Sequence, residues 1–125
     1  MSLRNEQSGP TMLVTKVDLN TVGDTPVSVP FAKYIVRRMT LFDASTTLAA
    51  SSATIGAYTA AAAGGTAIVT PATATGLTAA TKFNDRTVAV SADYQTAPVL
   101  YIRVGVANGA PATCSVCFEL ECLEG

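Results

Sequence analysis

The sequence contains no histidine and no tryptophan, and only 14% of its 125 residues are charged. Without histidine the commonest general base is missing, and with it the serine–histidine and cysteine–histidine nucleophile pairs and most catalytic zinc sites. Gly64-Gly65 belongs to no GxGxxG pattern, and no Gly-Lys-Ser/Thr follows it, so a phosphate loop is not predicted. The sequence therefore predicts a protein that is not an enzyme, with no catalytic residue, no cofactor and no metal site.

The acidic residues leave one enzymatic alternative open, a pair of carboxylates for glycoside hydrolysis. Several acids stand in turn contexts, because Asp24 follows Gly23 and Asp85 follows Asn84. Aspartate in such places commonly accepts a hydrogen bond from its own backbone. Solvated turn acids are far commoner than catalytic pairs, so the non-enzymatic interpretation is favoured.

Basic residues are few, since eight lysines and arginines stand against nine acids and leave a net charge of −1. Binding of nucleic acid or of an anionic membrane needs several clustered cations, so neither partner is predicted. No apolar run reaches the length of about 18 residues that a bilayer span requires. The N-terminus, MSLRNEQSGP, lacks the apolar core of a signal peptide, and we expect synthesis in a cytoplasm without export.

Three cysteines fall in one segment, TCSVCFELECL, which alternates in the manner of a strand. Along a strand Cys114 and Cys122 would lie about 26 Å apart, at about 3.3 Å per residue. A disulfide needs Cα atoms within about 7 Å of each other, and Cys117 would point to the opposite face. We therefore predict three reduced thiols that pack as small hydrophobic groups, as expected in a reducing cytoplasm.

Runs rich in valine, isoleucine, threonine and aromatic residues recur between turn signals, which predicts an all-β protein. We expect a disordered N-terminal segment over residues 1–10 and a single domain over residues 11–123. That domain is predicted to be an antiparallel β-sandwich of seven or eight strands, with a jelly roll as one form of it. The predicted strands are residues 11–19, 25–31, 33–45, 52–60, 66–73, 86–91, 99–107 and 113–122.

The last two of these runs predict a β-hairpin around a turn that begins with Asn108-Gly109. Pairing Ala107 with Thr113 would place the apolar side chains of both strands on one face, and a slip of one residue would destroy that arrangement. Arg103 and Glu119 would then meet diagonally on the other face.

The run KYIVRRMTLFDAS is apolar on both faces when it is taken as one regular strand. Met39 would lie on one face and Phe42 on the other, which is typical of a central strand or of a contact with a second subunit. Arg37 and Arg38 would point to opposite faces. Each is either an arginine that covers apolar groups with its stem or is ion-paired within its own chain, or an interface arginine that meets a carboxylate of a neighbouring subunit.

Residues 44 to 81 contain no charged side chain and consist largely of alanine and threonine. Such a stretch makes a poor solvent-exposed surface, whereas small side chains allow two subunits to approach closely. We therefore predict a homo-oligomer. The candidate subunit-interface residues are Arg37, Arg38, Phe42 and Tyr58.

Four segments in this order, YIVRRMTLFDASTTL, IGAYTAAAAGGTAIV, LTAATKF and VLYIRVGVANGAPATCSVCFELE, resemble small virion-type proteins of tailed bacteriophages and prophages. The resemblance covers most of residues 33–121. It departs from the family pattern at the three cysteines, where threonine, valine or tyrosine is expected. It implies an all-β sandwich or jelly roll and offers no catalytic residue.

This resemblance implies a structural protein of the virion, of the capsid decoration or cement type, made in the bacterial host cytoplasm. Its partners would be further copies of itself and other virion proteins. The alternative is a receptor- or glycan-binding module of a phage tail or surface fibre. The absence of tryptophan and the presence of only four tyrosines disfavour that alternative, because glycan sites usually display aromatic side chains.

Overall fold

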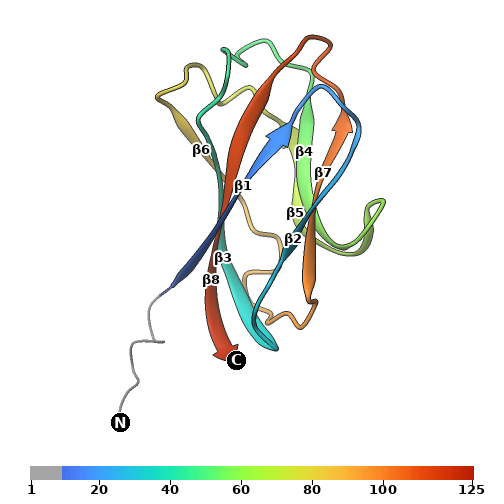
Figure 1. The fold of residues 1–125 in the computed structure, drawn as a ribbon, viewed down its shortest axis with the longest axis vertical. Coiled ribbons are helices and arrows are strands. Elements are labelled where there is room, and N and C mark those ends of the chain that lie inside the picture. Colours follow the sequence, from blue (N-terminus) through green and yellow to red (C-terminus); the bar gives the residue numbers. More distant parts are fainter. Residues whose placement is uncertain (1–9) are drawn as a thin grey trace.

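The computed structural model describes residues 10–125, which form eight β-strands and no helix (Figure 1). No helix that is long and apolar enough to cross a membrane is found in this range. The predicted disordered segment lies outside the described residues except for Pro10. The strands are β1 (Thr11–Asp18), β2 (Gly23–Ser28), β3 (Lys33–Phe42), β4 (Thr54–Ala60), β5 (Gly64–Thr73), β6 (Phe83–Arg86), β7 (Val99–Val106) and β8 (Thr113–Glu124).

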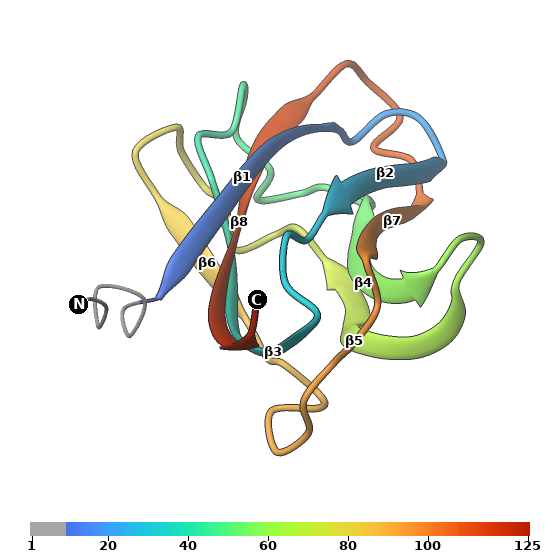
Figure 2. The same cartoon turned by 60° about the horizontal axis from the view of Figure 1, so that its bottom comes forward.

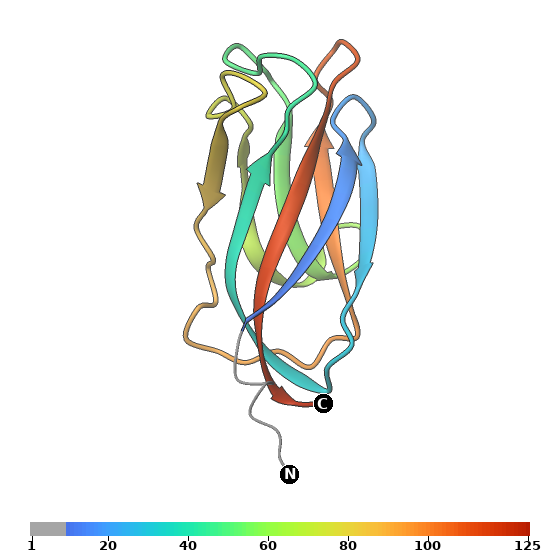
Figure 3. The same cartoon turned by 60° about the vertical axis from the view of Figure 1, so that its left-hand side comes forward.

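The strands form two antiparallel four-stranded sheets, in the orders β1-β8-β3-β6 and β2-β7-β4-β5 (Figure 3). The predicted antiparallel β-sandwich is therefore confirmed. The pairs are nested, since β1 pairs with β8, β2 with β7, β3 with β6 and β4 with β5. This nesting favours a jelly roll, in which one long hairpin is rolled over itself. The connections that follow β1, β3, β5 and β7 gather at one end of the sandwich.

The core lies between the sheets and follows from strict alternation along the central strands. From β8 it takes Cys114, Val116, Phe118 and Leu120, and from β7 it takes Leu100, Ile102 and Val104. Full burial of one such aliphatic or aromatic side chain stabilises the fold by about 1.5–3 kcal/mol. Tyr34 of β3 is also fully buried, and its hydroxyl group donates a 2.7 Å hydrogen bond to the carbonyl oxygen of Ala97.

The predicted hairpin of the last two strands is wrong, because β7 and β8 belong to different sheets. Their apolar faces do point toward each other, but across the core and not side by side. The turn between them crosses from one sheet to the other, and Asn108 donates its backbone N–H to the carbonyl oxygen of Leu19. Arg103 consequently forms an ion pair with Asp24 of β2 and does not meet Glu119. Alternation shows which side chains point inward, but it does not distinguish a neighbour within a sheet from a partner across the core.

A bulge in β3 explains why this strand seems apolar on both faces. Its pairing with β8 shifts register between Val36 and Arg38. The extra residue reverses the alternation, so that one face supplies the core on both sides of the bulge. The core-facing residues of β3 are Tyr34, Val36, Met39 and Leu41. The prediction that Arg37 and Arg38 point to opposite faces is wrong for the same reason, since both are exposed on the outer side of the sheet.

The predicted strand over residues 86–91 is displaced, because β6 ends at Arg86. The residues after it form no strand, although Ala89 donates its N–H to the carbonyl oxygen of Ile68 in β5. Val88 and Val90 are partly buried against the core. The alternation of apolar and other residues in this segment therefore reflects the packing of Val88 and Val90 against the core, in a segment that forms no continuous ladder of backbone hydrogen bonds with a neighbouring strand.

Candidate interaction surface

The outer side of the β1-β8-β3-β6 sheet, called the open face below, has a composition fixed by the strand registers. One row across the sheet runs from Val14 through Cys117 and Thr40 to Asp85. Two further rows flank it, one beginning at Met12 and one at Lys16. The open face consists of Met12, Val14, Lys16, Arg38, Thr40, Phe42, Phe83, Asp85, Ser115, Cys117 and Glu119.

Large apolar side chains at both edges of the open face are exposed to solvent. Met12 is 52% exposed and Val14 61% exposed on β1, and Phe83 is 67% exposed on β6. Phe42 lies beside Phe83 in the β3–β6 ladder and is half-buried. Single exposed hydrophobic residues are ordinary, but a group of them across one sheet face is typical of a contact surface.

Three of the four interface residues predicted from the sequence lie on the outer side of this sheet. Phe42 and Arg38 belong to the open face, and Arg38 is the neighbour of Glu119 in the β3–β8 ladder. Arg37 lies on the same side, one residue nearer the start of β3 than Arg38, and its Nε atom donates a 2.9 Å hydrogen bond to the carboxylate of Glu121. The side chains of this ion pair are 46% and 42% exposed, so it adds less than about 1 kcal/mol to stability.

The fourth predicted interface residue, Tyr58, lies on the outer side of the other sheet, opposite Tyr101 of β7. This outer side, called the covered face, is overlain in part by the turn between β4 and β5. Figure 2 shows that turn projecting on the side of its sheet that faces away from β1, β8, β3 and β6. The backbone N–H of Ala62 in the turn donates a 2.8 Å hydrogen bond to the carboxylate of Asp24. The four predicted residues therefore do not form one site.

Sequence alternation missed the exposed apolar residues of the open face. Alternation along residues 11–19 places Leu13, Val17 and Leu19 on one face, and it places Met12 and Val14 on the opposite face, where they are found. That signal was available, because the three successive residues from Met12 to Val14 are apolar, so that both faces of the strand carry apolar side chains there. Phe83 had no such signal, since its strand was predicted to begin three residues later.

The thiols differ in environment because they lie on both sides of β8. All three cysteines are free, as predicted for thiols on one strand. Burial raises the pKa of the Cys114 thiol to about 11, although the nearby Arg86 guanidinium opposes that change. Burial and the Glu119 carboxylate raise the pKa of Cys117, whose sulfur lies 3.8 Å from the sulfur of Met12 on the open face. Raised pKa values keep these thiols protonated and weakly nucleophilic near neutral pH.

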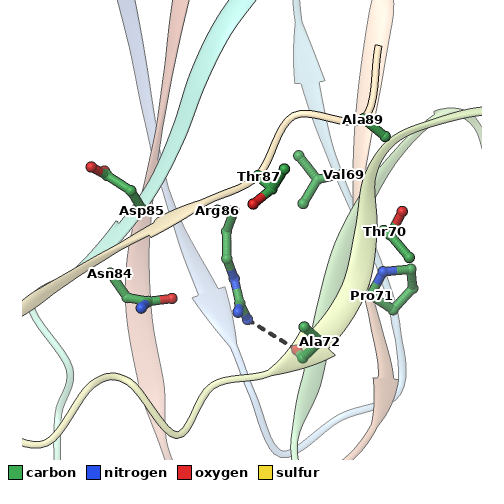
Figure 4. A pocket seen from close by; sticks show the side chains of 9 residues that line it. All are labelled: Val69, Thr70, Pro71, Ala72, Asn84, Asp85, Arg86, Thr87 and Ala89. Atoms are coloured by element: carbon green, nitrogen blue, oxygen red, sulfur yellow. Dashed lines mark hydrogen bonds between the residues drawn. The ribbon is translucent and has the colours of Figure 1, made fainter. Parts of the chain in front are cut away.

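A pocket of about 440 Å³ lies where the edges of the two sheets meet, between β5 and β6 (Figure 4). The Arg86 side chain crosses it and donates 3.0 Å hydrogen bonds to the carbonyl oxygens of Ala72 and Thr73. Asp85 points the other way and accepts a hydrogen bond from the hydroxyl group of Thr40. Arg86 therefore ties the two sheets together, and the lining offers no acid–base pair aimed at a common point.

Within residues 10–125, no three potential metal ligands among Asp, Glu and Cys lie close enough together to hold an ion. The chain matches no protein-family model, and a search of curated proteins finds no significant match. Among the described residues, the open face stands out as a sheet face that exposes apolar side chains at both of its edges.

Proposed function

We propose that this protein is a non-enzymatic structural component of a bacteriophage or prophage virion, of the capsid decoration or cement type. In this role it self-associates and binds other virion proteins, and it is made in the cytoplasm of the bacterial host. The observation that carries the proposal is the open face, which exposes Met12, Val14 and Phe83 across a four-stranded sheet.

An exposed sheet face of this kind suits contact with another protein surface better than capture of a small molecule. Small-molecule sites are concave and surround their ligand, whereas protein contacts combine a broad apolar centre with a polar rim. On the open face, Lys16 and Asp85 lie on the two edge strands and Arg38 and Glu119 on the central strands, between apolar and small side chains. Such a surface is suited to repeated contacts on a lattice, where many weak contacts act together.

A receptor- or glycan-binding module of a tail or surface fibre is the second candidate, favoured by one observation on the covered face. Tyr58 and Tyr101 are neighbours in the β4–β7 ladder, and both are partly exposed. Adjacent tyrosine rings offer a surface on which a sugar ring can stack. Glycan binding that is lost in both Tyr58→Ala and Tyr101→Ala would support this second function over the first.

Quantitative mass spectrometry of purified particles tests the proposal. A decoration protein covers a lattice, so we expect a copy number close to that of the major capsid protein. A copy number equal to that of the tail-fibre proteins would support the receptor-binding module instead. If the protein is absent from intact particles that are produced by a host expressing it, the virion role is wrong.

A further inference from the structure

The two edges of the open face carry opposite charges beside apolar side chains. On β1, Lys16 follows Met12 and Val14 on the outer side, and on β6, Asp85 lies two residues from Phe83. All five side chains are exposed. Each edge therefore presents a large apolar group next to one charge, and the sign of that charge is reversed between the edges.

The same reversal occurs once more at the ends of these two strands. Asp18, the last residue of β1, and Lys82, which directly precedes β6, are both exposed. Asp18 accepts hydrogen bonds from the backbone N–H of Asn20 and the hydroxyl group of Thr21, which are both neutral donors. Taken in the direction of β1, the charges along the β1 edge are positive at Lys16 and then negative at Asp18. In the same direction, the charges along the β6 edge are negative at Asp85 and then positive at Lys82.

The strand registers show how two open faces would meet. Val14 and Asp85 lie at one level of the sheet, and Lys16 and Phe83 lie at the next level. A half-turn about an axis that runs along the strands, in the plane of contact, places β1 of one copy over β6 of the other and keeps these levels. Lys16 then lies opposite Phe83 of the second copy and one level from its Asp85, while Val14 lies opposite Asp85 of the second copy and one level from its Phe83.

The alternative axis, across the strands, would place β1 over β1 and β6 over β6. Lys16 would then share an edge with Lys16 of the second copy, and Asp85 with Asp85, so that like charges approach each other. The charge distribution therefore selects the axis along the strands. We infer that the open face is a self-complementary surface that binds the open face of a second copy of this chain in that orientation.

The dimensions of the face set the expected affinity. Four strands about 4.8 Å apart, with eight residues in β1 and only four in β6, cover at most roughly 19 Å by 26 Å. This is small beside the about 800 Å² that each partner buries in a standard interface. We therefore expect a dissociation constant in the micromolar range. The inference rests on the self-association in the proposed function, but it does not depend on the virion setting.

Charge reversal tests the inference, with the dissociation constant measured by analytical ultracentrifugation of the whole protein. Lys16→Glu alone brings acid against acid, and Asp85→Lys alone brings base against base. Each variant should raise the dissociation constant roughly tenfold, because every contact occurs twice in the symmetric pair. An equimolar mixture of the two variants should form a heterodimer close to wild-type affinity, since the introduced glutamate meets the introduced lysine while the other contact stays native.

A matched control is Asp93→Lys, which makes the same charge change at an exposed site in the connection between β6 and β7. It should leave the dissociation constant unchanged. Circular dichroism of every variant checks that the fold is intact. Labelling of Cys117 by a maleimide gives a second readout, because association should protect this thiol in the wild type and not in Lys16→Glu.

Three results would each overturn the inference. They are a wild-type monomer up to near-millimolar concentration, an affinity that neither single variant changes, and single variants that weaken association but fail to restore it when mixed. None of these results affects the copy number in particles, so failure of the inference is distinguishable from failure of the proposed function.

Discussion

The two sheets bury their inner faces in the same way, but their outer faces differ. The covered face meets its own chain: Asp24 and Arg103 form an ion pair whose side chains are only 18% and 26% exposed, and Ala62 of the β4–β5 turn bonds to the same carboxylate. The open face has no such cover from residues 10–125, and it leaves Met12 and Phe83 in solvent. Substitutions on the covered face should therefore change stability, whereas those on the open face should change association.

The chain adopts a strained backbone to build its cover. Ala62 and Ala63 have φ angles of 58° and 61°, in the left-handed region that favours glycine. Each such residue costs roughly 1–2 kcal/mol. The hydrogen bond from Ala62 to Asp24 helps to offset that cost, which makes the turn and the ion pair one structural unit.

The largest effect is expected at Gly56, in the middle of the covered face. A Cβ atom there would lie 2.8 Å from the carbonyl oxygen of Val69 and 3.0 Å from the nitrogen of Pro71, both backbone atoms of β5. Gly56→Ala should therefore lower the free energy of unfolding by about 3 kcal/mol, as overpacking in a close contact does. Urea unfolding of the wild type and of Gly56→Ala measures this loss in the free energy of unfolding.

The matched control is Gly105→Ala on the neighbouring strand β7. There the added Cβ atom meets only the side-chain oxygen of Thr54, at 3.1 Å, which can move. A loss at Gly105 as large as that at Gly56 would contradict the view that close backbone approach is what requires glycine.

The second effect concerns the inner side of the open sheet and is seen at alkaline pH. The Cys114 thiol has a pKa of about 11 in the fold against 9.0 in an exposed thiol. A raised pKa favours the neutral form, so stability is complete below pH 9 and falls as the pH rises to about 11. The expected loss is roughly 2–3 kcal/mol for a shift of this size.

Urea unfolding of the wild type and of Cys114→Ala across this pH range checks the loss. The variant removes the contribution of Cys114, while that of Tyr34, whose pKa burial raises to about 12, remains in both proteins. The wild type should therefore lose more stability than the variant as the pH rises from 9 to 11. Equal pH dependence in the two proteins would show that Cys114 is not buried as the structure describes.

The third effect comes from the ion pair on the covered face. Asp24→Ala removes the acceptor of the Ala62 N–H and leaves Arg103 without its partner, so we expect a loss of about 1–2 kcal/mol. Asp24→Asn keeps an oxygen acceptor for Ala62 and should lose less. Thermal unfolding of both variants measures the difference, and equal losses would show that the charge matters and the hydrogen bond does not.

The smallest effect on stability is expected on the open face. Val14→Ser replaces an exposed side chain, and such substitutions usually change stability by less than about 0.5 kcal/mol. Unfolding is measured at a concentration where the protein is monomeric. A loss above about 1 kcal/mol would mean that Val14 packs within its own chain, and it would remove the contrast between the two faces.

The sequence was sufficient to predict the sandwich because the alternation of Val116, Phe118 and Leu120 survives in the structure, where all three are fully buried. It was not sufficient to assign strands to sheets. The apolar faces of β7 and β8 both point into the core, and a local pattern contains no information about which strands bond on either side. The bulge after Val36 was hidden for a related reason, since its effect on alternation resembles a strand buried on both faces.

The candidate surface was predicted only in part. Phe42 and Arg38 lie on the open face as members of a predicted interface, but Tyr58 lies on the other sheet. The covered face depends on the β4–β5 turn, in which Ala62 and Ala63 adopt the left-handed conformation. Residue propensities do not predict alanine at such positions. Tertiary contacts, such as that of Ala62 with Asp24, decide which of two similar faces stays exposed.

The nested pairing has a consequence for how the domain is synthesised. β8 lies between β1 and β3 in its sheet, yet it is the last of the eight strands to leave the ribosome. Until then, β1 and β3 have no central strand to bond with, and their unpaired edges stay open to wrong partners. Pairing strands from opposite ends of the chain is also slow. We expect the domain to fold only once β8 has been synthesised, in one late step, and to depend on chaperones until β8 is in place.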